Sequence, residues 1–274
     1  MFIWATICAV AAAVATTADA HGYLSRPAAR QFKCFRDGRF WWPETGEDIP
    51  DEACRRAYRT VYAKYRSSGE SGGVAANAAQ YMFQQYFEYA ALAGADYQNL
   101  EHVQHNVVAA DLCAAGASDR SRPFGDKSGI DEPFDDWRAD TLYPRADESA
   151  SSRAVALHFC PTTVHEPSFF QIFISREAYN YTRKLTWRDL ELVENETPAR
   201  LIANDGTDEN CASPSVYALE ARVPLRPGKF VLYVRWQRRD VAGEGFYNCA
   251  DVMFDANSLG TLVRNRDVRN RDEL

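Results

Sequence analysis

The second half of the chain contains five short segments rich in strand-forming residues, and apolar and polar residues alternate clearly in several of them. Such alternation is typical of a β-strand with one face against a core. Turn signals such as Arg226-Pro227-Gly228 separate the segments. Short strands at this spacing predict a mainly β protein built as an antiparallel sandwich. The segments are Arg153 to Cys160, Phe169 to Ser175, Tyr217 to Val223, Phe230 to Gln237 and Tyr247 to Phe254.

The chain before these strands has a different pattern. Asp51 to Arg66 and Ala75 to Ala93 are predicted helices, the first capped by Asp51 and the second stopped by Gly94. Ser118 to Ser152 is charged and carries Gly and Pro, which predicts a loop. We therefore expect an immunoglobulin/fibronectin-III-like antiparallel β-sandwich over residues 21–257, with a helical and loop insertion at about 40–150.

The first twenty residues are expected to be absent from the folded protein. Met1 to Ala20 is apolar and Ala-rich and ends in Ala18-Asp19-Ala20, the small-residue pattern of a cleaved secretory signal peptide. A buried N-terminal helix is the alternative, but the segment has no polar face. Cleavage would make His21 the first residue, and His21 to Arg30 then predicts an extended start.

Secretion would allow the cysteines to form disulfide bonds. Loss of Cys8 with the signal leaves six, which in an oxidising compartment predicts three disulfides whose pairing stays open. Asn180-Tyr181-Thr182 and Asn195-Glu196-Thr197 permit N-glycosylation. Residues 258–274 are a polar tail ending in Arg271-Asp272-Glu273-Leu274, close to the signal that retains proteins in the ER lumen. The six cysteines are Cys34, Cys54, Cys113, Cys160, Cys211 and Cys249.

Composition excludes several classes of protein. With 46% hydrophobic and 13% aromatic residues, the chain is able to bury a core. A formal net charge of -7 argues against a nucleic-acid-binding surface. Outside the N-terminus no apolar run is long enough to span a membrane. The sequence contains neither a Walker loop nor a dinucleotide-binding fingerprint.

Five histidines restrict where a metal could bind. An N-terminal His21 would offer its α-amino and ring nitrogens to one ion, and one further imidazole would complete a three-nitrogen set suited to copper. By spacing alone, His21 is more simply a residue that follows a cleavage site. His102 and His105 would share a helix face and could bind zinc, but a solvated pair is favoured. His158 alternates with apolar neighbours and is expected to be structural.

Six segments, in this order, change the weight given to His21: His21 to Arg30 followed by Cys34, Asp111 to Gly116, Thr162 to His165, Leu185 to Leu190, Val234 to Arg238, and Gly245 to Val252. Together they resemble lytic polysaccharide monooxygenases, in the family of bacteria and viruses that acts on chitin and cellulose. The resemblance covers His21 to about Phe254. The long insertion and the Arg-Asp-Glu-Leu ending resemble most the viral spindle proteins called fusolins and their baculovirus relatives.

The resemblance implies a role for several residues. His21 and His165 resemble the two arms of the family's copper site, His21 with amino and ring nitrogens and His165 with a ring nitrogen. Phe246 occupies the axial aromatic position, and Glu244 the position of a Glu or Gln that hydrogen-bonds the oxygen species. Thr163 departs from the alanine common there, which puts the packing over the axial face in question.

The resemblance also implies disulfides, cofactors and a substrate. The pairs would be Cys34 with Cys54, Cys113 with Cys249, and Cys160 with Cys211. The implied reaction is copper-dependent oxidative cleavage of crystalline chitin, with one copper per chain, an external electron donor, and O2 or H2O2 as co-substrate. Such an enzyme would act as a virulence factor on insect chitinous gut lining. Trp41 and Trp42 are candidates for stacking on sugar rings, with packing in the core or in the insertion at least as good an explanation.

Two other functions remain open at the level of the sequence. One is a chitin-binding protein without catalysis, which would need no copper. The other is a structural protein that self-associates into spindles of a viral occlusion body, and this role is compatible with enzymatic activity. The expected location is the secretory pathway. The Arg-Asp-Glu-Leu ending indicates the ER lumen, and the protein is also expected to be secreted or associated with the virion.

Overall fold

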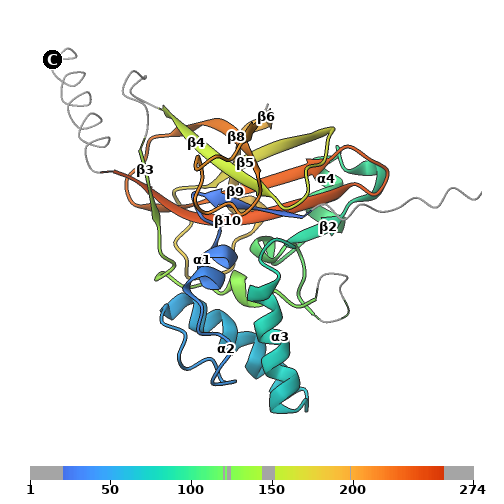
Figure 1. Cartoon of the computed structure of the whole chain (residues 1–274), viewed down its shortest axis with the longest axis vertical. Helices are drawn as coiled ribbons and strands as arrows, with labels where there is room; N and C mark the ends of the chain where they lie inside the picture. The colour runs from blue at the N-terminus through green and yellow to red at the C-terminus, as the bar shows by residue number, and fades with distance from the viewer. Residues whose placement is uncertain (1–20, 120, 122–124, 144–151, 198, 256–274) are drawn as a thin grey trace, which may run out of the picture.

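The computed structural model describes residues 21–255, except 120, 122–124, 144–151 and 198. The predicted signal peptide and the retention-like ending lie outside the described residues. Two β-sheets are stacked in one half of the molecule, and helices extend from one side of them (Figure 1). This confirms a mainly β sandwich. Within the described residues, no helix has the length and apolar character needed to cross a membrane.

Each sheet combines strands from distant parts of the sequence. The four-stranded sheet has the order β1-β4-β8-β7. The larger sheet has the order β2-β10-β9-β5-β6, and β3 pairs with β10 in parallel, whereas the other described pairs are antiparallel. The strands are β1 (Gly22–Arg26), β2 (Ala90–Leu92), β3 (Asp140–Leu142), β4 (Ser152–Pro161), β5 (Ser168–Ser175), β6 (Leu190–Thr197), β7 (Arg200–Ala203), β8 (Ser215–Pro224), β9 (Lys229–Arg238) and β10 (Glu244–Phe254).

Aromatic side chains fill the space between the two sheets. The Trp236 ring on β9 is fully buried, and its centroid lies 5.2 Å from that of Phe159 on β4 and 5.6 Å from that of Tyr217 on β8. The five strands expected from alternation are therefore confirmed as β4, β5, β8, β9 and β10. Burial of apolar area between the sheets provides most of the driving force for this arrangement.

A second core joins the helices to the outer face of the larger sheet. The helices are α1 (Arg30–Asp37), α2 (Glu52–Ser67), α3 (Gly72–Gln84) and the short α4 (Leu100–His102). As expected, Asp51 caps α2, because its Oδ1 accepts a hydrogen bond from the Cys54 amide at 2.8 Å. Buried side chains of α2 and α3 form one cluster with Tyr233 and Tyr247 from the sheet. Short 3-10 turns lie at Gly94–Asp96, Leu112–Ala114, Ser128–Asp131 and Trp187–Asp189, and a π turn at Val103–Val107.

Three expectations about this region need correction. The helix predicted for Ala75 to Ala93 ends at Gln84, and Ala90–Leu92 instead forms β2, paired with Glu244–Phe246 of β10. The predicted loop Ser118 to Ser152 contains β3, which pairs with the end of β10. Strand pairing satisfies the edge of β10, and this tertiary gain outweighs the helical propensity of alanine. The predicted extended start ends at Arg26, because α1 begins at Arg30.

Three disulfides stabilise the fold. Cys34–Cys54 joins α1 to α2, Cys113–Cys249 joins the turn at Leu112–Ala114 to β10, and Cys160–Cys211 joins β4 to the loop before β8. The Cα atoms of each pair lie 5.2–5.3 Å apart, as in native disulfides. The pairing implied by the family resemblance is confirmed.

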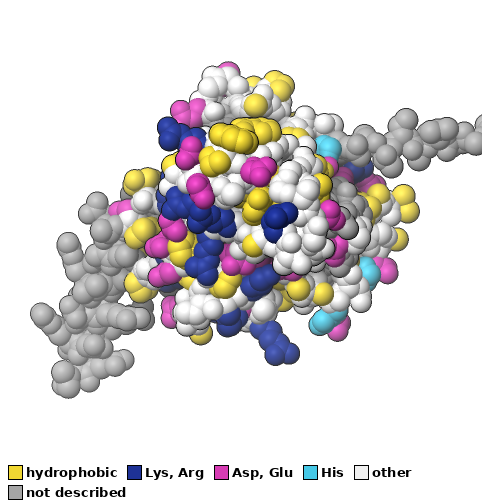
Figure 2. Space-filling view, turned by 90° about the horizontal axis from the view of Figure 1, so that it is seen from below, with side chains coloured by type: hydrophobic (Ala, Val, Ile, Leu, Met, Phe, Trp, Pro, Cys, Tyr) yellow, Lys and Arg dark blue, Asp and Glu magenta, His cyan; other side chains and the backbone are white. Residues whose placement is uncertain are grey.

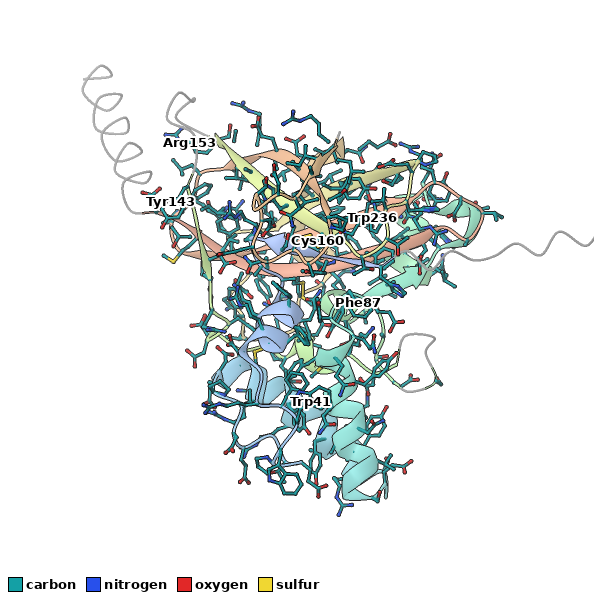
Figure 3. All side chains as sticks on the ribbon, viewed as in Figure 1. Trp41, Phe87, Tyr143, Arg153, Cys160 and Trp236 are labelled. Carbon is teal, nitrogen blue, oxygen red and sulfur yellow. A yellow bond between two sulfur atoms is a disulfide. The ribbon has the colours of Figure 1, made fainter. Side chains whose placement is uncertain are left out.

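The side chains of the candidate sugar-binding tryptophans lie on the surface. Trp41 and Trp42 are 56% and 74% exposed, so neither packs in the core. The Trp41 ring does pack within the insertion, with its centroid 4.9 Å from that of Phe40. Figure 3 places Trp41 in the helical region, well away from Phe87 at the junction with the sheets.

The face viewed from below carries basic and acidic side chains side by side (Figure 2).

Gly129 allows a close approach between α2 and the turn at Ser128–Asp131. A Cβ atom at this position would lie 2.2 Å from the carbonyl oxygen of Ala57 and 3.1 Å from Sδ of Met82. We expect Gly129→Ala to lower the free energy of unfolding by about 1–3 kcal/mol, because backbone in a packed core cannot move away cheaply. Urea denaturation followed by circular dichroism measures this.

Gly73 in α3 provides the matched control for that substitution. A Cβ atom there meets nothing within 4 Å, and alanine favours helix, so Gly73→Ala is expected to keep or raise stability. Equal stability of the two variants would show that the contact at Ala57 is not limiting.

Candidate metal centre

His21 is held at one end of the sandwich by backbone hydrogen bonds on both sides. Its carbonyl oxygen accepts from the Thr162 amide at 2.8 Å and from Thr162 Oγ1 at 3.1 Å. The next amide, of Gly22, donates to the carbonyl of Phe87 at 2.9 Å. Phe87 lies where the helical region meets the sheets (Figure 3). The side chain of His21 is 21% exposed and therefore accessible to an ion from solvent.

His165 lies at the same end of the molecule, in the loop between β4 and β5. Three residues earlier, Thr162 makes the contacts with His21 just described, so this loop brings the two histidines to one region. The hydroxyl of Tyr217 donates to the His165 carbonyl at 3.2 Å and fixes the loop to β8. The imidazole is 23% exposed, and its Nε2 lies 3.0 Å from Oδ2 of Asp240.

Phe246 lies beside His21 on the buried side. It belongs to β10 and is fully buried, with its ring centroid 6.4 Å from that of His21. The Trp236 ring packs against it at 5.1 Å and prevents movement away from the site. An apolar ring in this place offers no donor atom to a metal. The axial role that the resemblance implies for Phe246 stays a prediction.

Glu244 connects to His165 through two charged residues. It precedes Phe246 by two positions in β10, so both side chains point to the same face of the strand. Its Oε2 accepts from Nη1 of Arg238 at 2.6 Å, and Nη2 of Arg238 lies 2.7 Å from Oδ2 of Asp240. Asp240 in turn contacts Nε2 of His165. The predicted residues His165 and Glu244 therefore belong to one network.

Electrostatics in this network keep Asp240 ionised. Partial burial acts to raise the pKa of its carboxyl, but the Gly243 amide and the Arg238 guanidinium outweigh burial, and the pKa is lowered. A carboxylate against a ring nitrogen is a common way to orient a metal-binding imidazole. Neither residue was assigned a role from the sequence: Arg238 ends β9 as one polar residue of a segment that resembles the family, and Asp240 lies in the turn that follows.

Glu88 is a second carboxylate that sequence reasoning missed. Its Oε1 lies 3.6 Å from Nε2 of His21, and its Oε2 accepts from the hydroxyl of Tyr81 at 2.9 Å. Burial acts to raise its pKa, but His21 and Lys127 outweigh burial and lower it. The segment was predicted to be helix, where Glu88 would have been one solvated residue. Its aromatic neighbours, Tyr86-Phe87-Glu88-Tyr89, were the only available signal.

The remaining histidines bind protein groups. Nε2 of His102 lies 3.2 Å from the Ala93 carbonyl oxygen, and Nδ1 of His105 lies 2.9 Å from that of Glu101. His158 is buried, with Nδ1 3.2 Å from Oδ2 of Asp208, and is structural as expected. Among the described residues, no group of three or more His, Cys, Asp and Glu side chains is arranged to hold a metal.

Comparison with known proteins assigns a family to this arrangement. The family model described as "Lytic polysaccharide mono-oxygenase, cellulose-degrading" matches residues 21–252, which begin at His21 and contain every residue of the candidate centre. The chain belongs to this family. The chain also has viral relatives. It is 49% identical over 237 residues to spindolin of Heliothis armigera entomopoxvirus, and the matched residues cover 86% of this chain and 67% of that protein.

Solved structures and bacterial relatives of this mono-oxygenase family member agree with the assignment. Fusolin from spindles of Anomala cuprea entomopoxvirus superposes with a TM-score of 0.81 at 45% identity, covering 86% of this chain and 90% of that chain. The chitin-binding protein CbpD of Pseudomonas aeruginosa is 26% identical over 262 residues, which cover 92% of this chain and 53% of CbpD. The chain therefore spans about half the length of that bacterial relative.

The side chains present fit a small ion bound through nitrogen. Two imidazoles are reachable from solvent, each has a carboxylate at Nε2, and a buried phenyl ring closes one side. Cleavage before His21 would add a primary amine. Three nitrogen donors suit copper, and by ligand type also zinc. A fusolin structure that is 47% identical to this chain was solved in complex with zinc.

Proposed function

We propose that the protein, once processed to begin at His21, binds one copper ion and cleaves crystalline chitin by oxidation. The observation that carries this proposal is the grouping of His21, His165 and Phe246 at one end of a sandwich that belongs to the mono-oxygenase family. The bound copper would supply one-electron redox chemistry, using an external donor and O2 or H2O2.

The side chains of the protein would bind the ion, exclude water from its buried side and form hydrogen bonds with the co-substrate. His21 would hold the ion through its amine and ring, and His165 through its ring. Phe246 would exclude water and any fourth protein donor from the buried side. Glu244, held by Arg238, would accept a hydrogen bond from the co-substrate.

Chitin is supported as the substrate by the relatives. CbpD is named a chitin-binding protein, and this name carries the choice of chitin. A relative from Streptomyces ambofaciens, 28% identical over 243 residues, is named a lytic cellulose monooxygenase, so cellulose is the alternative substrate. The site lies on partly exposed residues at one end of the molecule, and an exposed site suits a solid polymer. An insect chitinous gut lining is the proposed target, with the protein acting as a virulence factor and reaching it through the secretory pathway.

Product analysis tests the proposal directly. The copper-loaded protein beginning at His21, incubated with β-chitin, ascorbate and O2, is expected to release oxidised oligosaccharides detectable by mass spectrometry. The same incubation with cellulose tests the substrate class, and omission of ascorbate is the control. A protein that binds copper and chitin but releases no oxidised product would leave only the binding function.

A structural role is the second candidate function. The solved relatives include fusolin spindles from Anomala cuprea entomopoxvirus and from a Wiseana entomopoxvirus, at 45% and 44% identity. We infer self-association of this chain into spindles from that likeness. Crystalline bodies recovered from cells expressing the full chain would support this role, which is compatible with catalysis.

A further inference from the structure

Lys127 is a buried cation that lies behind the candidate metal centre. Its side chain has no exposed surface, and its Nζ lies 4.9 Å from the ring centroid of Tyr89 and 5.8 Å from that of Tyr81. Burial lowers the pKa of this lysine to about 8, although Glu88 opposes the shift. Burying a charge away from water costs free energy unless a nearby group compensates it. The group that compensates Lys127 therefore indicates what this residue stabilises.

That partner is Glu88, which Lys127 contacts twice. Nζ donates to the Glu88 carbonyl oxygen and lies 3.5 Å from the carboxylate Oε2. Tyr81 also donates to Oε2, so this oxygen is held from two sides. The other oxygen, Oε1, faces Nε2 of His21. The order of contacts is therefore Lys127, Glu88, His21, from the interior to the surface.

The side of His21 that faces Glu88 matters for chelation. The two ring nitrogens of histidine are distinct, and the one occupied by a partner decides which is left for a metal. A chelate formed by the amine and ring of one histidine can close through Nδ1, because Nε2 lies on the far side of the ring. A carboxylate at Nε2 therefore favours the tautomer that leaves Nδ1 free.

We propose that Lys127 is a positioning residue for the metal centre, acting through Glu88 to hold Nε2 of His21 toward the carboxylate and Nδ1 toward the metal. This inference rests on the proposed function. The inference goes beyond the proposed function because it concerns the orientation of the His21 ring. That orientation can be measured without any catalytic turnover.

Two single variants, their double variant and a matched control test the proposal. Lys127→Met keeps the length of the side chain and removes the charge, and Glu88→Gln removes the carboxylate. Lys33→Met is the control, because Lys33 is also buried and paired with a carboxylate, Asp140 at 3.0 Å, at a different place. All are made in the full chain processed to begin at His21, and folding is checked by melting temperature.

Two measurements report on His21 itself. In the metal-free protein, nitrogen-15 NMR of the imidazole gives the tautomer, and we expect Lys127→Met and Glu88→Gln to reduce the Nε2–H form. With Cu(II) added, both variants should bind about 10–100-fold more weakly and give altered electron paramagnetic resonance spectra. Lys33→Met should match the parent protein in both measurements.

The outcomes separate this inference from the proposed function. If Glu88→Gln alters the ring and Lys127→Met does not, Lys127 has no positioning role. If Lys127→Met has the same effect with or without Glu88→Gln, it does not act through Glu88. If Lys127→Met fails to fold, Lys127→Arg must preserve the parent spectra. A parent protein that binds no copper overturns the proposed function instead.

Discussion

His165→Ala is expected to weaken Cu(II) binding by more than about 100-fold and to abolish release of oxidised chitin fragments. Loss of a partner that only orients a metal ligand costs about 10–100-fold in affinity, and loss of a ligand itself costs more. Because the imidazole of His165 is partly exposed and contacts a carboxylate, Asp240, that is itself partly exposed, the fold should tolerate the change. Isothermal titration calorimetry with Cu(II), on protein beginning at His21, measures the affinity.

His105→Ala is the matched control for this prediction. His105 is exposed and its ring contacts a backbone carbonyl in the helical region. Its loss should leave copper affinity unchanged. One extra alanine before His21 should weaken binding as strongly as His165→Ala, because the primary amine moves away. If His165→Ala and the protein with the extra alanine both bind Cu(II) as tightly as the parent protein, the assignment of His21 and His165 is refuted.

Asp251→Asn is expected to lower the free energy of unfolding by about 3–5 kcal/mol, because it leaves a buried guanidinium uncompensated. Arg30 donates from Nε and Nη2 to the two oxygens of Asp251 at 2.7 and 2.8 Å, and the two side chains are 3% and 1% exposed. Burial acts to lower the pKa of Arg30, but Asp251 outweighs burial and raises it. This pair attaches α1 to β10.

Urea denaturation without reductant measures that loss, so that the disulfides stay intact. Asp135→Asn is the control, because Asp135 is 85% exposed beside Lys229 and its loss should cost at most about 1 kcal/mol. Replacing both buried partners, Arg30→Met with Asp251→Leu, should recover most of the stability, since no charge is left buried. Similar losses for Asp251→Asn and Asp135→Asn would contradict the account.

The sandwich was predictable because its strands alternate with the period of a sheet. In Tyr217 to Val223, for example, buried residues alternate with more exposed ones over most of the segment. Phe230 to Gln237 shows less alternation because both of its faces are buried. The strand Ala90–Leu92 was not predictable, because three residues rich in alanine carry no such pattern and are determined by the edge of β10. Likewise β3 has only three residues and follows a charged stretch.

Some residues of the candidate centre were likewise predictable from the sequence, and others were not. His21, His165, Phe246 and Glu244 were found because each lies in a segment that resembles the family, and disulfide pairing followed from the same likeness. Glu88 lies in a segment that was predicted to be helix, and Lys127 and Asp240 lie outside the segments that resemble the family. Arg238 lies in such a segment, but the resemblance gave it no role. Their importance depends on partners far away in sequence, such as Lys127 and Glu88, which are 39 residues apart.

By itself, the sequence determined the five longer strands and the six cysteines that pair, because periodicity and residue type are local properties. It also determined the two histidines to consider, because each lies in a segment that resembles the family. Only the tertiary structure decided which carboxylate faces which imidazole, and which buried cation compensates each carboxylate. Those choices depend on burial and on distances of a few ångströms between separate elements. Electrostatic interactions change steeply over such distances and with burial, and no local pattern in the chain encodes them.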